Sequence, residues 1–135
     1  MSSRILLVMP RERRDKLLNF LAENGMDVTA AGNVAEAHRR LSDPLPYDLA
    51  FVDAELPDGS WRDVLQYMVA SPKPAEMVVC ARCGDERLWA EVIQCGVFDL
   101  IPEPYERQEI LRIIRSALDS HYMRRFSHAA EARAS

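Results

Sequence analysis

The sequence lacks several features on which common classes of function depend. It has only five glycines, and none of them forms the GxGxxG or P-loop pattern that cradles phosphates in nucleotide-binding proteins. Its apolar runs are too short to cross a membrane, and its amino terminus lacks the long apolar segment of a secretory signal. Acidic residues outnumber basic ones by 21 to 17, which argues against nucleic acid held by net positive charge. We therefore predict a cytoplasmic protein with no membrane contact and no direct nucleic-acid binding by this domain.

Cysteine and histidine are also scarce, with three residues of each. Cys80 and Cys83 have the CxxC spacing that is typical of redox and zinc sites. A zinc site would need further ligands, however, and the histidines show no pairing at ligand spacing. A thiol enzyme would need a histidine beside its cysteine, and none is placed there. We interpret these residues as free, buried or half-buried thiols and predict no metal site.

What the sequence does have is a regular alternation of strand-like and helix-like segments. The predicted strands span 5–8, 27–31, 49–52, 77–80 and 98–101, and the predicted helices 12–24, 34–41, 61–70, 85–95 and 106–122. A length of 135 residues and a hydrophobic content of 48% suit one domain with a substantial core. Strands that alternate with helices in this way predict an α/β fold of the (βα)5 type, whose parallel sheet is doubly wound, with helices on both faces.

The carboxyl ends of such strands meet at one edge of the sheet, where ligands bind in doubly wound folds. Asp53 comes directly after four apolar residues, so its carboxylate is expected at a strand end, half-shielded from water. The turn signals proper begin only at Pro57. We therefore interpret Asp53 as a functional carboxylate rather than a turn cap.

Three runs of the sequence resemble the receiver domain of bacterial two-component response regulators. They are RILLVMPRERRDKLLNFLAENGMDVTAA, YDLAFVDAELPDGS and CGVFDLIPEPY, and the similarity extends over residues 4–120. The resemblance implies a flavodoxin-like sheet of strand order 2-1-3-4-5, in a receiver-like domain over 1–122 that is followed by a helical extension or linker over 123–135. It implies that Asp53 accepts a phosphoryl group from a histidine kinase, and that Glu103 and Pro104 are joined by a cis peptide bond. It also implies a signalling module rather than an enzyme.

The sequence departs from the family pattern at most of the positions that support phosphorylation. The two adjacent acids that hold Mg²⁺ in the family are replaced by Met9 and Pro10, neither of which offers a charged oxygen. The Thr or Ser after the fourth strand is Ala81, the lysine after the fifth is Glu103, and the aromatic switch residue is Leu100. Because phosphoryl transfer depends on positioning and charge neutralisation, we predict weak or absent phosphorylation and weak or absent binding of Mg²⁺.

These departures gather negative charge at the edge. Glu103 and Glu55 are expected near Asp53, and such a cluster raises at least one carboxyl pKa unless a cation intervenes. Arg11 and Arg82 flank the same edge, so one hypothesis is that their guanidinium groups pair with these carboxylates in place of the metal. The alternative is that both arginines point into solvent. The predicted site is therefore lined by Met9, Pro10, Glu55, Ala81, Arg82 and Glu103 around Asp53.

Several functional alternatives stay open at this stage. One is a phosphorylation-competent receiver in which Glu55 or Glu12 helps to recruit a metal, and another is a flavodoxin-like cofactor-binding enzyme. The partners that we expect are a histidine kinase or another signalling protein, a second copy bound through the face formed by the fourth helix, fifth strand and fifth helix, and an output domain after Ser135. After Tyr122 the sequence continues through Arg124 to His128 and then as AAEARAS, an Ala-rich end of high helix propensity. It fits either an extended fifth helix that leads to an output domain or docks a partner, or a surface helix with a frayed tail.

Overall fold

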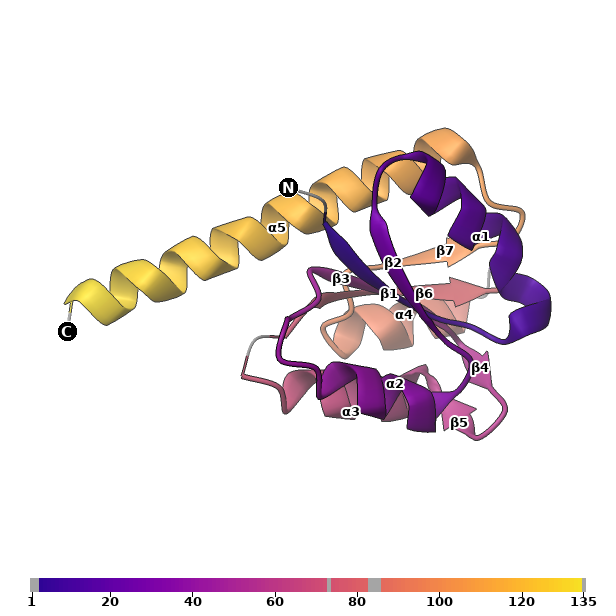
Figure 1. Cartoon of the computed structure of the whole chain (residues 1–135), viewed down its shortest axis with the longest axis horizontal. Helices are drawn as coiled ribbons and strands as arrows, with labels where there is room; N and C mark the ends of the chain where they lie inside the picture. Colours follow the sequence, from indigo (N-terminus) through magenta and orange to yellow (C-terminus); the bar gives the residue numbers. More distant parts are fainter. Residues whose placement is uncertain (1–2, 73, 83–85, 135) are drawn as a thin grey trace.

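The computed structural model describes residues 3–72, 74–82 and 86–134. Its centre is a parallel sheet of five strands (Figure 1). The strands are β1 (Arg4–Val8), β2 (Asp27–Ala31), β3 (Leu49–Asp53), β6 (Glu76–Ala81) and β7 (Asp99–Pro102). Their order across the sheet is β2-β1-β3-β6-β7, which is the predicted order 2-1-3-4-5 when these five strands are counted along the chain. The doubly wound, flavodoxin-like fold is thereby confirmed.

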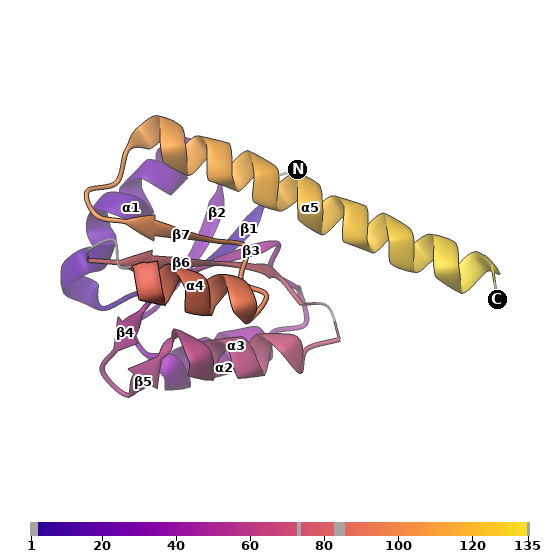
Figure 2. The same cartoon turned by 180° about the vertical axis from the view of Figure 1, so that it is seen from behind.

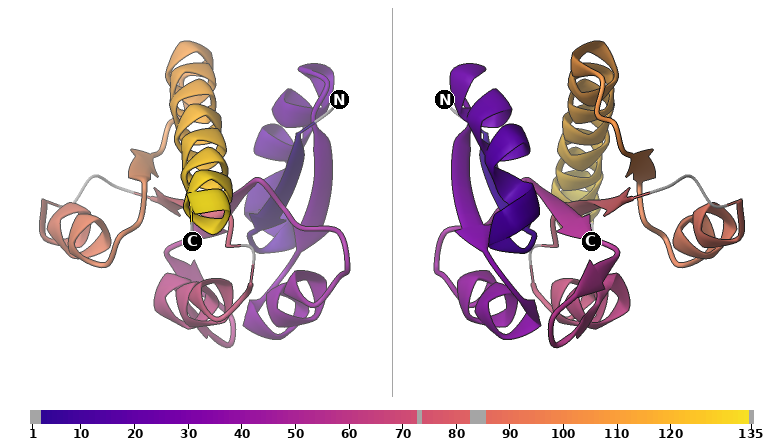
Figure 3. Two further views of the ribbon diagram at one scale, coloured as in Figure 1. Left: turned by 90° about the vertical axis from the view of Figure 1, so that its left-hand side faces the viewer. Right: turned by 90° about the vertical axis from the view of Figure 1, so that its right-hand side faces the viewer.

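Helices cover both faces of this sheet, as Figure 2 and the end-on views of Figure 3 show. They are α1 (Arg11–Glu23), α2 (Val34–Leu41), α3 (Trp61–Val69), α4 (Glu86–Gln94) and α5 (Arg107–Ala134). Side chains alternate between the faces of a strand, so that β1 serves two cores. Its Leu6 and Val8 pack with α2, α3 and α4, whereas Ile5 and Leu7 pack with α1 and α5.

The predicted helix boundaries have clear local causes. Asn33 caps α2, because its side chain accepts a hydrogen bond from the backbone N–H of Glu36 at 2.8 Å. Gly25 and Gly96 follow α1 and α4 with φ angles of 78° and 84°, a left-handed conformation that suits glycine. These signals confirm how the sequence separates its helices from the strands that follow them.

One small element was not predicted. After Asp53 the chain forms a short antiparallel ribbon from β4 (Glu55–Leu56) and β5 (Gly59–Ser60), where sequence reasoning saw only a turn. Asp58, at the tip of the ribbon, accepts hydrogen bonds from the backbone N–H groups of Val34 at 2.7 Å and Ala35 at 3.1 Å. The loop that follows the central strand is thus tied to the amino terminus of α2.

The last helix is much longer than the periodic pattern predicted. α5 has 28 residues and continues past residue 122 to Ala134 as one helix, so that its final turns extend away from the body of the domain (Figure 1). The structure therefore favours the helical alternative for 124–134. Across the described ranges, no helix is both long enough and apolar enough to span a membrane.

Candidate functional site

The site is organised around Asp53, the last residue of the central strand β3. All five residues of β3 are buried, and Asp53 itself is only 1% exposed. Burial raises the pKa of Asp53, although the guanidinium of Arg13 and the backbone N–H of Glu55 act in the opposite direction. A buried carboxylate in this position needs a partner, since an unpaired charge away from water is costly.

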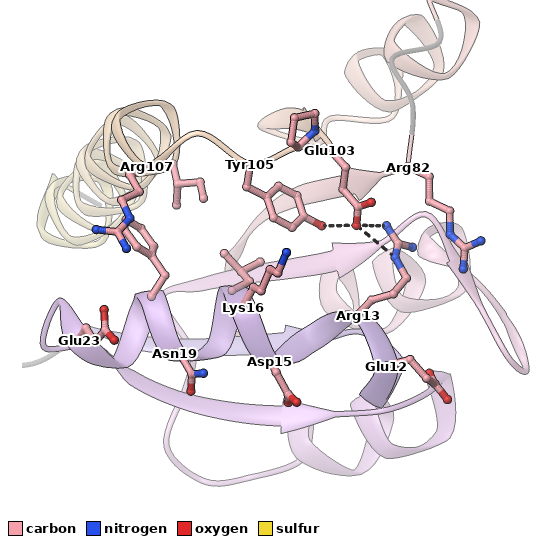
Figure 4. Close-up of a pocket in the computed structure, with 14 residues that line it drawn as sticks. Glu12, Arg13, Asp15, Lys16, Asn19, Glu23, Arg82, Glu103, Tyr105 and Arg107 are labelled. Atoms are coloured by element: carbon pink, nitrogen blue, oxygen red, sulfur yellow. Dashed lines mark hydrogen bonds and ion pairs between the residues drawn. The ribbon is translucent and has the colours of Figure 1, made fainter.

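That partner is Arg13, in the first turn of α1. Its Nη1 donates to Asp53 Oδ2 at 2.5 Å, and its Nη2 donates to Glu103 Oε1 at 2.8 Å (Figure 4 shows the Glu103 contact). The Nε of Arg13 also points to Glu103 Oε1, at 3.3 Å. Burial alone would lower the pKa of Arg13, but the hydrogen bond to Glu103 and the charges of both carboxylates raise it. One guanidinium group therefore joins the end of β3 to the segment after β7.

Glu103 is held from several sides. Its backbone N–H donates to Ala81 O at 2.9 Å, and the cis peptide bond that the resemblance implies joins it to Pro104. The hydroxyl of Tyr105 lies 3.5 Å from Glu103 Oε1, the same oxygen that Arg13 contacts (Figure 4). The side chain of Glu103 is 35% exposed, so its ion pair with Arg13 lies at the border between the buried site and solvent.

Cys80 lies beside this cluster and is chemically quiet. It pairs in register with Asp53 across β3 and β6 and is fully buried. Burial and the charge of Asp53 raise the pKa of its thiol to about 12, so that it stays protonated at neutral pH. Cys95 is free and exposed, and Cys83 lies outside the described residues. The prediction of a buried free thiol is confirmed for Cys80.

The other predicted site residues are placed less closely around the carboxylate. Met9 is fully buried in the core under α1 and α5, and Pro10 is the residue that precedes α1. Ala81 is buried at the end of β6 and carries no hydroxyl. Glu55 is exposed on β4, and Arg82 is exposed after β6. The structure therefore brings Asp53 and Glu103 together through a third residue and leaves the Glu55 side chain outside the ion-pair network.

The hypothesis that arginine pairs with these carboxylates was right in kind but wrong in its residues. No hydrogen bond joins the described Arg11 or Arg82 to Asp53, Glu55 or Glu103; Arg82 contributes only through its charge. Arg13 was missed, although a signal existed. It precedes the buried Leu17 and Leu21 by four and eight residues, which places all three on the face of α1 that meets the sheet.

The residues at this edge do not fit the magnesium site that the family implies. A hard cation needs oxygen ligands, but Met9 and Pro10 offer none from their side chains, and Arg13 already occupies Asp53 Oδ2. Within the part of the chain that the structure describes, no group of three or more His, Cys, Asp or Glu residues is arranged to hold a metal ion. The cation beside Asp53 is supplied by the protein itself.

An open cavity of about 1150 Å³ adjoins the site, between α1 and the start of α5 (Figure 4). Its lining mixes both signs of charge, with Lys16, Arg82 and Arg107 among the bases and Glu12 and Asp15 among the acids. Arg13 and Glu103 line this groove, whereas Asp53 is not part of its lining.

The sheet order and the carboxylate at the end of the central strand are both features that the resemblance to receiver domains implies. The model of the response regulator receiver domain matches residues 11–115. The chain belongs to the response regulator receiver domain family.

Two relatives illustrate the range of proteins in which such sequences occur. The response regulator protein PilR of Pseudomonas aeruginosa is 28% identical over 105 residues, which are 78% of this chain and 23% of PilR. The chemotaxis protein CheY of Bacillus subtilis is 27% identical over 121 residues, which are 88% of this chain and 100% of CheY. The chain thus spans less than a quarter of one relative and the whole of the other.

Solved structures share the fold at lower sequence identity. A CheY-like receiver domain from Methanospirillum hungatei superposes with a TM-score of 0.80 at 20% identity, covering 92% of this chain and 99% of that one. NtrX from Brucella abortus, solved with ADP, gives a TM-score of 0.81 at 21% identity and covers 99% of this chain and 30% of its own.

Proposed function

We propose that this receiver domain is a signalling module whose acceptor position, Asp53, is held by Arg13, and that it acts mainly through protein contacts with weak or absent phosphorylation. The observation that carries the proposal is the Arg13 guanidinium, which bonds Asp53 and Glu103 together at 2.5 and 2.8 Å. In this proposal Asp53 keeps the position of a phosphoacceptor without the groups that make one efficient.

The chemistry of phosphoryl transfer supports this view. The attacking carboxylate oxygen must be accessible, and the charge that develops on the equatorial oxygens must be neutralised by positioned cations and donors. Here Arg13 binds Asp53 Oδ2, Ala81 carries no hydroxyl, and Glu103 brings a negative charge to the position of the family's lysine. Each change opposes either the approach of a phosphodonor or the retention of the product. We propose accordingly that Mg²⁺ binds weakly or not at all.

A domain that works by contacts needs surfaces for its partners. We propose a histidine kinase or another signalling protein as the partner, with the mixed-charge groove beside α1 as one contact region. A homodimer through the α4–β7–α5 face is supported by two exposed apolar residues of α4, Trp89 at 52% and Ile93 at 42% exposure. An output domain after Ser135 is supported by PilR and NtrX, in which the matched region is 23% and 30% of the protein. We further propose a location in the cytoplasm and no catalytic activity toward a small-molecule substrate.

A phosphodonor experiment tests the proposal. The full chain is incubated with acetyl phosphate and Mg²⁺, and the intact mass is measured over time. We expect little stable adduct, because Asp53 is buried with its Oδ2 bonded to Arg13, and the hydroxyl and the lysine that support phosphorylation in the family are missing. A near-stoichiometric gain of one phosphoryl group that disappears in Asp53→Asn would instead establish the phosphorylation-competent alternative.

Binding of the metal can be followed separately through Trp61. This residue is 3% exposed, and its backbone N–H donates to Ala54 O at 3.3 Å, one residue from Asp53. We expect its fluorescence to stay constant through millimolar Mg²⁺. Saturable quenching that is lost in Asp53→Asn would contradict the proposed role of Arg13 as the resident cation.

A further inference from the structure

A second polar cluster lies at the opposite edge of the sheet, where α5 leaves the domain. The buried face of α5 carries Ile110, Ile113, Ile114 and Ala117, and the next residue on that face is His121, which is only 7% exposed. Tyr122 and Met123, which follow, are 68% and 71% exposed. Beyond them the helix extends away from the body (Figures 1 and 2). An imidazole therefore occupies the point at which the contact between helix and sheet ends.

This imidazole faces a carboxylate that is fixed to the sheet. Nε2 of His121 lies 3.4 Å from Oδ1 of Asp48, the residue before β3. The other oxygen of Asp48 accepts a hydrogen bond from the backbone N–H of Arg4 at 2.9 Å, and the backbone N–H of Asp48 donates to Arg4 O at 2.8 Å. Asp48 is thus anchored to β1, and the contact with His121 joins α5 to the start of the strands β1 and β3.

The other charged groups around this cluster come from several elements. Glu76, at the start of β6, is 2% exposed, and the hydroxyl of Ser120 lies 3.5 Å from its Oε1. On β1, the guanidinium of Arg4 forms an ion pair with β2, because its Nε lies 3.9 Å from Oδ2 of Asp27. Along the helix, Arg125 follows His121 by four residues in the sequence. The described contacts of His121 and Ser120 with charged groups at the strand ends are both with carboxylates, those of Asp48 and Glu76.

We propose that His121 is a proton-dependent latch, which in its charged form pairs with Asp48 and holds the last docked turn of α5 against the sheet. A charged imidazole 3.4 Å from the Asp48 carboxylate is attracted to it in a largely buried position, whereas the neutral ring has no charge with which to form that pair. Histidine is the side chain that can gain or lose a charge near neutral pH. Protonation favours the docked helix, so the contribution is present in mild acid and is lost as the pH rises.

Amide hydrogen exchange of the full chain, followed by mass spectrometry at about pH 5.5 and pH 8, tests this proposal. After correction for intrinsic exchange rates, we expect residues 115–123 to be about tenfold more protected at the lower pH, an effect that one largely buried ion pair can produce. His121→Gln should remove this difference, because glutamine does not titrate. His38→Gln is the matched control, because His38 is exposed on α2 and stacks on Tyr67 away from α5.

Asp48→Asn provides a second test that keeps the imidazole and removes its charged partner, and it should also abolish the pH response. Equal protection of residues 115–123 at the two pH values in the unmodified chain would overturn the proposal. A pH response that persists in His121→Gln or Asp48→Asn would overturn it too, because the titrating group would then lie elsewhere. If neither variant folds, the unmodified chain alone decides.

Discussion

At the carboxyl edge of the sheet the carboxylate of Asp53 is paired with an arginine, whereas at the amino edge Asp48 is paired with a histidine. The two pairs connect helices to opposite ends of β3, and both lie largely out of water. They differ in the cation, because an arginine keeps its charge at every physiological pH and a histidine does not. The first pair is therefore a constant part of the structure, and we infer that the second responds to protons.

The largest expected effect comes from breaking the constant pair. Arg13→Ala leaves the carboxylate of Asp53 buried at 1% exposure without its cation, and we expect a loss of about 3 kcal/mol in the free energy of unfolding at neutral pH. The loss should shrink in mild acid, because the pKa of Asp53 is already raised by burial and would rise further without the guanidinium. Urea denaturation at several pH values measures both effects.

Arg11→Ala is the control for this experiment, because Arg11 is exposed in the same turn of α1. It should change the stability by less than about 0.5 kcal/mol. Equal effects of the two substitutions would show that the Arg13 pair contributes nothing beyond an ordinary surface charge.

A smaller effect is expected from Asp58, a carboxylate near the carboxyl edge whose partners are backbone N–H groups. Although slight burial acts the other way, the hydrogen bonds from Val34 and Ala35 lower the pKa of Asp58. Asp58→Ala should destabilise the domain by about 1 kcal/mol or less, since the group is exposed. A lowered pKa means that this contribution is present above the ordinary aspartate value and is lost as the pH falls below about 4.

Thermal unfolding at pH 7 and in acid checks this prediction, with Asp119→Ala on the exposed side of α5 as the control. A deficit of Asp58→Ala that stays the same down to pH 3 would exclude the capping role. The expected result would distinguish the Arg13–Asp53 pair, in which the arginine stays charged, from the Asp58 cap, which is lost in acid.

The smallest effect is expected at the amino edge. Because the charged form of His121 pairs with Asp48 in our proposal, His121→Gln should cost more global stability at pH 5.5 than at pH 8, and less at either pH than Arg13→Ala costs at neutral pH. Chemical denaturation at the two pH values, beside His38→Gln, measures the difference. A cost that is the same at both pH values would show that the His121–Asp48 pair, like the Arg13–Asp53 pair, does not respond to protons.

Much of the fold could be predicted from the sequence, because continuous apolar runs specify strands that are buried on both faces. Residues 5–8 and 49–52 are examples, and the glycines at 25 and 96 mark where the chain must turn. The β4–β5 ribbon could not be predicted, since two-residue strands are too short to show any periodicity. The continuation of α5 could not be decided from the sequence, because its periodic apolar positions end near Tyr122.

The candidate site was predicted in part. Asp53 and Glu103 follow strands, so their place at one edge could be inferred from position alone. Arg13 lies on a helix, and its direction depends on the phase of that helix relative to Leu17 and Leu21 rather than on its distance from a strand end. His121 continues the apolar stripe of α5 and resembles a core residue until Asp48 is seen beside it.

Because α5 continues far beyond its last docked turn, a small change of angle at that turn is amplified at the carboxyl end of the helix. From His121 to Ala134 the helix rises about 20 Å, so a tilt of about 10° at the last docked turn would move the carboxyl end by about 3.5 Å. A segment or partner attached to the carboxyl end would therefore be displaced further than the atoms of the last docked turn.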